Sequence, residues 1–297
     1  MKKVKEKNKS VLLLDSGDTL FNMNEKIDQR SLAKSELILR VYQAIGYDAI
    51  NIGEVDLQAD SESLYRHPFL SSNLRSKGKE PAPFKSYIFK EFDGFRVAIF
   101  GLSEPNSFAL EKFLSEDPVE SAQRVLESIQ TESNLIICLT NLNLEGNKRL
   151  AQMTHGIDII IGGEPQEPLS QPILIKDTLI FYGGTYGQYV GQIELTIQDL
   201  KRPFKFSNLH LKSLVLEDLE NLERRIQNKF TKDSHKDPWS LSELVAWREK
   251  LKNRLGQLLG GNTLNHLLIP LDSRWEDDSD VKLWTEEFKL RRHSNPY

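Results

Sequence analysis

Residues 134–166 read NLIICLTNLNLEGNKRLAQMTHGIDIIIGGEPQ and hold two apolar runs separated by a polar segment. The runs at 135–139 and 157–161 have the length of buried strands, and residues 147–153 between them have the spacing of a short helix. A glycine pair follows the second run and predicts a turn directly after that strand. A buried strand, a helix and a second buried strand are typical of an α/β protein.

The same alternation continues outward from this stretch. Apolar runs at 11–14 and 49–52 predict strands, and the apolar spacing over 29–45 predicts the helix that joins them. Further strands are expected at 69–74, 87–92, 97–102, 173–175, 179–182 and 190–197, with a helix at 118–130. Alternating elements followed by strands joined through turns predict two packed sheets with helices outside.

The character of the sequence changes after about residue 203. Residues 214–230 and 241–259 are amphipathic and predict a helical hairpin, and residues 281–289 predict a last short helix. We therefore expect a first domain over residues 1–210. Residues 211–297 are expected to form a helical hairpin and a tail packed on that domain, and these helices are the candidate surface for a protein partner.

Composition excludes some classes of function. Of the 297 residues, 39% are hydrophobic and 28% are charged, and the net charge of −4 argues against nucleic acid or an anionic membrane as the partner. The lone cysteine, Cys138, lies in an apolar run and is expected to be a small buried residue. No run reaches the length of a transmembrane segment, and the start MKKVKEKNKS lacks the apolar core of a signal peptide.

Polar residues follow several of the expected strands. In open α/β sheets the loops after the strands converge at one edge, and ligands bind there. Five such strand ends carry the candidate site: residues 15–18, 53–56, 139–141, 162–166 and 183–184.

Five ordered segments resemble the 5′-nucleotidase family of metallophosphatases, which are calcineurin-like phosphoesterases. They are LLLDSGDTLF (12–21), GYDAINIGEVD (46–56), SSNL (71–74), the stretch 134–166 quoted above and TLIFYGGTYGQYVGQIEL (178–195). The resemblance implies a four-layer α/β/β/α sandwich with two mixed sheets over about residues 11–197, here followed by a helical extension. The remaining residues are too few and too helical for the family's nucleotidase C-terminal domain.

Enzymes of this family hold two divalent metals that activate water and bind a phosphate ester. The resemblance places five residues of this chain at metal-binding positions: Asp18, Glu54, Asn141, Glu164 and Gln166. Asp18 matches the bridging aspartate, and Glu54 replaces an asparagine. Asn141, Glu164 and Gln166 replace histidines, so every imidazole ligand of the pattern is changed.

Catalysis is expected to be lost. Val55 stands where the family has the histidine beside the leaving group, and valine cannot transfer a proton. The Asp-x-His motif of the family's first strand is also absent from this sequence. We interpret the chain as a pseudoenzyme that serves as a binding or structural module, with no catalytic residue and no cofactor expected. The sequence does not identify substrate-binding residues.

Two alternatives remain open. The oxygen-rich set could hold one divalent cation (Mg, Mn or Ca), which would make the chain a metal-dependent phosphoesterase hydrolase. Otherwise, the sequence could be part of a longer gene with an upstream strand that carries Asp-x-His. An upstream signal peptide would then imply a periplasmic or extracellular location.

Overall fold

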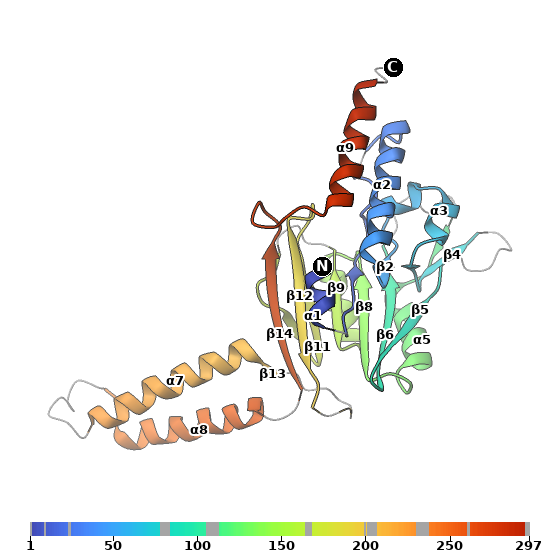
Figure 1. The fold of residues 1–297 in the computed structure, drawn as a ribbon. Coiled ribbons are helices and arrows are strands. Elements are labelled where there is room, and N and C mark those ends of the chain that lie inside the picture. The colour runs from blue at the N-terminus through green and yellow to red at the C-terminus, as the bar shows by residue number, and fades with distance from the viewer. Residues whose placement is uncertain are drawn as a thin grey trace. The chain divides into compact units, whose positions relative to one another are not determined.

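The computed structural model describes residues 2–8, 10–22, 25–77, 84–104, 113–163, 168–198, 200, 207–229, 238–259 and 262–294 (Figure 1). Its helices are α1 (Lys2–Lys7), α2 (Gln29–Ile45), the 3-10 helix η1 (Val55–Gln58), α3 (Ser61–Tyr65), α5 (Pro118–Ile129), α6 (Leu144–Met153), α7 (Leu209–Asn228), α8 (Leu241–Leu259) and α9 (Ser279–Ser294). Its strands are β1 (Leu14–Asp15), β2 (Ala49–Asn51), β3 (Phe69–Leu70), β4 (Leu74–Ser76), β5 (Tyr87–Phe92), β6 (Phe95–Leu102), β7 (Phe113–Ser115), β8 (Leu135–Thr140), β9 (Ile159–Gly162), β10 (Ile173–Ile175), β11 (Thr178–Tyr182), β12 (Tyr189–Thr196), β13 (Ser207–Asn208) and β14 (Thr263–Pro270).

The largest sheet has the strand order β10-β11-β9-β8-β6-β5. Its four inner strands are parallel, and the strands at its two edges, β10 and β5, run antiparallel to their neighbours. All six residues of β8 are buried, as expected for an inner parallel strand covered on both faces. Residues of α5 and α6 share one hydrophobic cluster with β6, β8, β9 and β11. The carboxyl ends of the four parallel strands therefore meet at one edge of a rigid, covered sheet.

A second sheet, β1-β2-β3, is parallel and packs against the first through β6. A Cβ atom on Gly101 of β6 would lie 2.5 Å from Oδ1 of Asn51 and 2.9 Å from the carbonyl oxygen of Leu70. Only glycine allows so close an approach, so Gly101 sets how closely the sheets pack. Asn51 also donates from Nδ2 to the carbonyl oxygens of Ser16 and Leu102, each at 3.0 Å, which ties the ends of β1, β2 and β6 together.

Helix α2 packs on the second sheet and has well-defined ends. Asp28 caps its first turn by accepting hydrogen bonds from the backbone N–H groups of Arg30 and Ser31. Gly46 ends it in the left-handed region, at φ 77°. The ammonium group of Lys5 on α1 donates to the last carbonyl oxygens of this helix, a favourable position for a cation.

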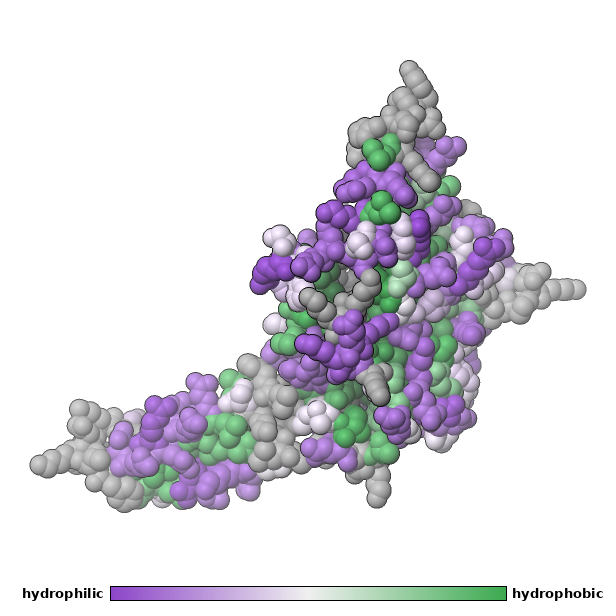
Figure 2. All heavy atoms as spheres, in the orientation of Figure 1, coloured by the Kyte–Doolittle hydropathy of each residue, from purple (hydrophilic) through white to green (hydrophobic). Residues whose placement is uncertain are grey.

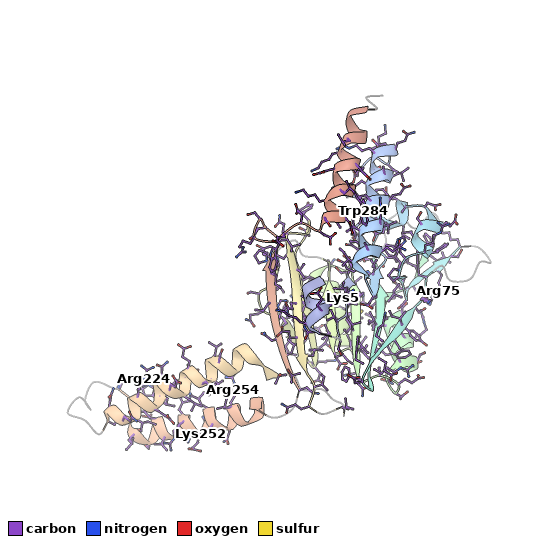
Figure 3. The ribbon with its side chains drawn as sticks, viewed as in Figure 1. Lys5, Arg75, Arg224, Lys252, Arg254 and Trp284 are labelled. Carbon is purple, nitrogen blue, oxygen red and sulfur yellow. The ribbon has the colours of Figure 1, made fainter. Side chains whose placement is uncertain are left out.

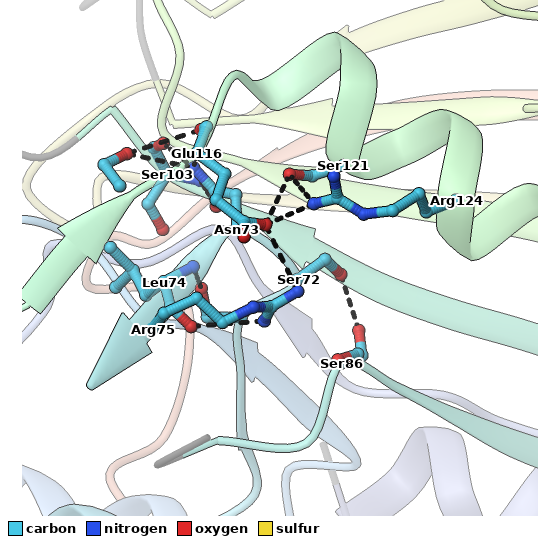
Figure 4. Close-up of polar contacts among 11 residues, drawn as sticks. Ser72, Asn73, Leu74, Arg75, Ser86, Ser103, Glu116, Ser121 and Arg124 are labelled. Carbon is cyan, nitrogen blue, oxygen red and sulfur yellow. Dashed lines mark hydrogen bonds and ion pairs between the residues drawn. The ribbon is translucent and has the colours of Figure 1, made fainter. Parts of the chain in front are cut away.

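A buried asparagine joins the short two-stranded sheet β4-β7 to the end of β6 (Figure 4). Asn73 donates to the carbonyl oxygen of Ser103 at 2.7 Å and to that of Glu116 at 3.3 Å, and it accepts from the Ser103 N–H at 3.0 Å. The carboxylate of Glu116 also pairs with Arg75 and Arg124. This arrangement fixes residues 103 and 116, where the chain enters and leaves the part of the sequence between β6 and α5.

The chain divides into two compact units, Met1–Gly191 with Leu268–Tyr297 (unit 1) and Gln192–Leu267 (unit 2). In unit 2, α7 and α8 pack as an antiparallel pair with their own core: Val215, Leu219, Leu222, Leu244 and Leu251. Figure 2 shows mostly hydrophilic side chains on this hairpin, with smaller hydrophobic areas between them. Leu214 and Leu216 are among its exposed residues. In unit 1, α9 packs on α2.

Most of the expected elements are confirmed, with some shifted boundaries. Helix α6 begins at Leu144 rather than at residue 147, because the Asn143 side chain caps it by accepting from the Gly146 N–H at 2.8 Å. The α/β fold class is confirmed, although the described strands form four hydrogen-bonded groups where two sheets were expected. The boundary at residue 210 stays a prediction, and compactness places residues 268–297 with unit 1. Among the described residues, no helix has the length and apolar character needed to cross a membrane.

Candidate functional site

The loop after β1 brings Asp18 to the strand-end edge through two residues with positive φ. Gly17 has φ 98° and Asp18 has φ 57°. A Cβ atom on Gly17 would lie 2.7 Å from the carbonyl oxygen of Asn51 and 2.8 Å from the Gly53 nitrogen, so only glycine fits there. A non-glycine residue in the left-handed region, as at Asp18, is uncommon and persists only where its surroundings hold it.

Both carboxyl oxygens of Asp18 accept hydrogen bonds from the protein. Oδ1 accepts from the backbone N–H of Val55 at 3.0 Å, and Oδ2 accepts from Nδ2 of Asn141 at 3.2 Å. Burial raises the pKa of Asp18, and the bonds from Val55 and Asn141 oppose that rise. The side chain thus links the loop after β1 to the loops after β2 and β8.

Asp56 holds the same loops through hydrogen bonds to their backbone. It is fully buried, and its carboxyl accepts four backbone hydrogen bonds: from Asp18 at 2.8 Å and from Thr19, Leu20 and Gly53 at 2.9 Å each. Burial, followed by the neighbouring carboxyl of Asp18, raises the pKa of Asp56 to about 7. This residue holds the turn that presents Asp18.

Asp15 forms a third polar anchor at the end of β1. Its carboxyl accepts from the Gly17 N–H at 2.8 Å, from the Thr19 hydroxyl at 3.0 Å and from the Tyr42 hydroxyl at 2.7 Å. The ring of Tyr42 stacks on that of Tyr47 with the centroids 4.1 Å apart, and burial raises the pKa of Tyr47 to about 12. Asp15 therefore shapes the turn that begins the site, and it joins the turn to α2.

Hydrogen bonds at both ends of the Asn141 amide group fix its orientation. Its Oδ1 accepts from the backbone N–H of Glu104 at 3.1 Å, so its Nδ2 is directed at Asp18. Beneath it, the buried Asn147 accepts from the Thr140 hydroxyl at 2.7 Å and donates to the Tyr182 hydroxyl at 2.9 Å. This network connects the ends of β8 and β11.

The structure brings part of the predicted site together. Asp18, Asn141 and the backbone of Glu54 converge, and the Glu54 backbone contributes a hydrogen bond to the Asp18 carboxyl. Glu164 and Gln166 lie outside the described residues, so their placement stays a prediction. Among the residues that the structure describes, no three His, Cys, Asp or Glu side chains are grouped so that they could hold a metal ion.

Sequence reasoning singled out residues 53–56 but did not recognise the role of Asp56. A carboxylate flanked by Val55 and Leu57, both buried, is the signal that could have found it. Such a residue in an apolar segment needs several donors to be accommodated. Asp56 is structural in this sense, because its partners are all backbone N–H groups.

Comparison with known proteins agrees with this geometry. No family model matches the chain. The chain is 26% identical over 324 residues to a 5′-nucleotidase of Vibrio parahaemolyticus, covering 92% of this chain and 54% of that protein. It is 24% identical over 303 residues to protein UshA of Yersinia enterocolitica, covering 84% of this chain and 53% of that protein. The chain therefore spans about half the length of the curated relatives it matches.

A solved structure supports the same fold. The NAD nucleotidase (NadN) of Haemophilus influenzae aligns with a TM-score of 0.63 and 17% identity, over 99% of this chain and 53% of that one. The chain thus has an α/β fold similar to that of this nucleotidase. In sequence, the chain is similar to proteins named 5′-nucleotidase and UshA over most of its length.

The raised pKa of Asp56 leads to a prediction about stability. Its ordinary value is 3.8 and its folded value is about 7, so between these pH values the folded chain keeps a proton that the unfolded chain has released. The free energy of unfolding contributed by this group should therefore fall as pH rises from about 4 to about 7, and level off above. Urea unfolding at pH 5, 6, 7 and 8 measures the slope.

Asp18→Asn is the companion variant for this titration. It removes the charge next to Asp56, so the folded pKa of Asp56 should drop and the fall in stability should become shallower. Equal slopes in the wild type and in Asp18→Asn would contradict the assignment.

Proposed function

We propose that this chain is a 5′-nucleotidase-like metallophosphatase domain that does not hydrolyse phosphate esters and serves as a binding or structural module. The observation that carries the proposal is the hydrogen bonding of the Asp18 carboxyl group. Its two carboxyl oxygens already accept hydrogen bonds from Val55 and Asn141. A bridging metal ligand needs free lone pairs directed at the ions, so the bonds to both oxygens compete with metal binding.

The neighbouring side chains support the same conclusion. Asn141 presents Nδ2, a donor, toward Asp18, and its oxygen is engaged by the Glu104 N–H. An amide nitrogen does not bind a cation. Val55 is buried and apolar at the position where the family has a proton-transferring histidine. The described residues thus do not fit a two-metal centre, and we derive no hydrolytic step through one.

Metal analysis and a phosphatase assay test the proposal on the full chain. After equilibration with Mg²⁺, Mn²⁺, Ca²⁺ or Zn²⁺ and removal of free metal, we expect far less than one ion per chain by elemental analysis. Hydrolysis of p-nitrophenyl phosphate and of its bis-ester should equal that of Asp18→Ala. Addition of a chelator should leave the thermal unfolding midpoint unchanged.

One alternative function has a specific observation in its favour. Asp18 and Asn141 converge, and their carboxyl and amide side chains carry the kind of oxygen atoms that bind one hard cation. That alternative requires the Asn141 amide to turn its oxygen to the cation. Stoichiometric Mg²⁺, Mn²⁺ or Ca²⁺ together with hydrolysis that is lost in Asp18→Ala would establish the alternative and refute the inactive module.

A further inference from the structure

A hollow of about 350 Å³ lies on unit 1 between α2 and α3, and it shares no residue with the Asp18 site. Helix α2 contributes Glu36, Leu39 and Arg40, while α3 and the residues after it contribute Ser63, Arg66 and His67. The named lining holds two arginines, one glutamate and one histidine. The hollow has the concave shape and the few charged groups expected of a small-molecule subsite.

Arg40 is the unusual residue of this hollow. Its guanidinium carbon lies 3.9 Å from the ring centroid of Trp284, so the planar group stacks on the indole. Figure 3 shows Trp284 on α9 at the side of α2. Within the part of the chain that the structure describes, Arg40 makes no hydrogen bond and no ion pair. Stacking occupies a face of the group, and the N–H groups at its edge have no protein acceptor among the described residues.

The other ionisable residues of the hollow differ in whether they form hydrogen bonds or ion pairs with the protein. Arg66 pairs with Glu62, and Nδ1 of His67 lies 2.7 Å from the carbonyl oxygen of Ser63. Because a carbonyl oxygen only accepts, Nδ1 carries the proton and Nε2 is the free ring nitrogen. Glu36, one helical turn before Arg40, forms no ion pair with it in the described structure. Arg40 is thus oriented by an aromatic ring and not by a carboxylate.

We propose that this hollow binds an oxyanion, the phosphate or carboxylate group of a small molecule, with Arg40 as its forked donor. A guanidinium group carries a positive charge, and its two parallel N–H groups match carboxylate and phosphate oxygens. Stacking on Trp284 holds the side chain in place, so less rotamer freedom is lost on binding. Arg66 also lines the hollow, where its charge is compensated by the ion pair with Glu62, and Glu36 opposes the anion.

Calorimetric titration of the full chain with potassium phosphate tests the proposal, with total ionic strength held constant by potassium chloride. We expect saturable binding with a Kd on the order of 1 mM, typical of a single charged subsite on a surface. Arg40→Gln should weaken binding by about tenfold or more, since it removes a charge-assisted fork. A parallel titration with succinate distinguishes a carboxylate ligand from a phosphate ligand, and saturable binding of either supports the site.

Arg254→Gln is the matched control. It removes the same charge from an exposed residue of α8 that does not line the hollow (labelled in Figure 3), and should leave the Kd unchanged. Trp284→Leu keeps all charges but frees the Arg40 side chain, so it should weaken binding less than Arg40→Gln does. Glu36→Gln removes the opposing charge and should tighten binding.

Two results would overturn the proposal. One is the absence of saturable binding of both probes to the wild type at several times the expected Kd. The other is equal weakening by Arg40→Gln and Arg254→Gln, which would reflect general surface charge. Thermal unfolding midpoints establish that each variant is folded, and Arg40→Lys, which keeps the charge and loses the fork, replaces Arg40→Gln if that variant does not fold.

Discussion

Replacement of Asp56 by asparagine should lower the free energy of unfolding by about 2–6 kcal/mol, because two buried N–H groups would lose their acceptor at about 1–3 kcal/mol each. Asp56 Oδ1 accepts from Thr19 and Leu20, and Oδ2 accepts from Asp18 and Gly53. Asparagine keeps one oxygen and turns an NH₂ group toward the other pair of donors. We expect the loss to appear in urea unfolding at pH 5, followed by circular dichroism, because most of the cost of ionising the buried carboxyl is absent at that pH and does not offset the loss.

Asp60→Asn provides the comparison for this variant. Asp60 is also an aspartate whose side chain accepts a backbone hydrogen bond, from Ser63 N–H at 3.1 Å, but it is exposed and caps α3. Asparagine is as good a capping residue as aspartate, so this change should alter stability by only a few tenths of a kcal/mol. If the two variants have similar stability, the four bonds to Asp56 do not hold the turn as described.

The second large loss in the free energy of unfolding is expected on replacement of Asn73. Asn73→Ala would leave the N–H and the carbonyl oxygen of Ser103 without their partner and would remove a bond to Glu116 (Figure 4). Unsatisfied buried groups at about 1–3 kcal/mol each, plus the space left by the amide, give an expected loss of about 3–5 kcal/mol. Urea unfolding at pH 7 measures the loss.

A matched asparagine on the surface separates this effect from substitution in general. Asn221 on α7 is exposed and accepts a bond from Arg224, so Asn221→Ala should change stability little. Alanine also has the higher helix propensity, which favours a slight gain. A loss at Asn73 below about 1 kcal/mol would mean that the ends of β4 and β6 are held by other contacts.

The sequence predicted the strand-end edge well because buried parallel strands leave a clear pattern. The apolar runs of β8 and β9 located two neighbouring strands, and the residues after β1 and β8 were expected to meet. Asp18 and Asn141 do lie together. Their hydrogen bond could not be predicted, because the amide orientation depends on the Glu104 N–H, which comes from another loop.

Other features could not be predicted from the sequence, because they depend on contacts that form only in the folded chain. The role of Asp56 depends on the positive φ values of Gly17 and Asp18, which aim successive N–H groups at one carboxyl. The placement of the Arg40 side chain depends on α9, which is remote from α2 in the sequence and supplies Trp284. Sequence periodicity gives the faces of single helices, but it does not give the pairing of helices that are distant along the chain.

The position of unit 2 in the chain has a consequence for how the gene can change. Unit 2 is one continuous segment, and the chain leaves unit 1 on β12 and returns on β14, two strands that are neighbours in one sheet. A segment whose two ends are adjacent behaves as a cassette: its length can vary, or it can be exchanged, without altering the connectivity of the strands outside it. Recombination at this point would give chains that share the metallophosphatase fold and differ in the module they carry.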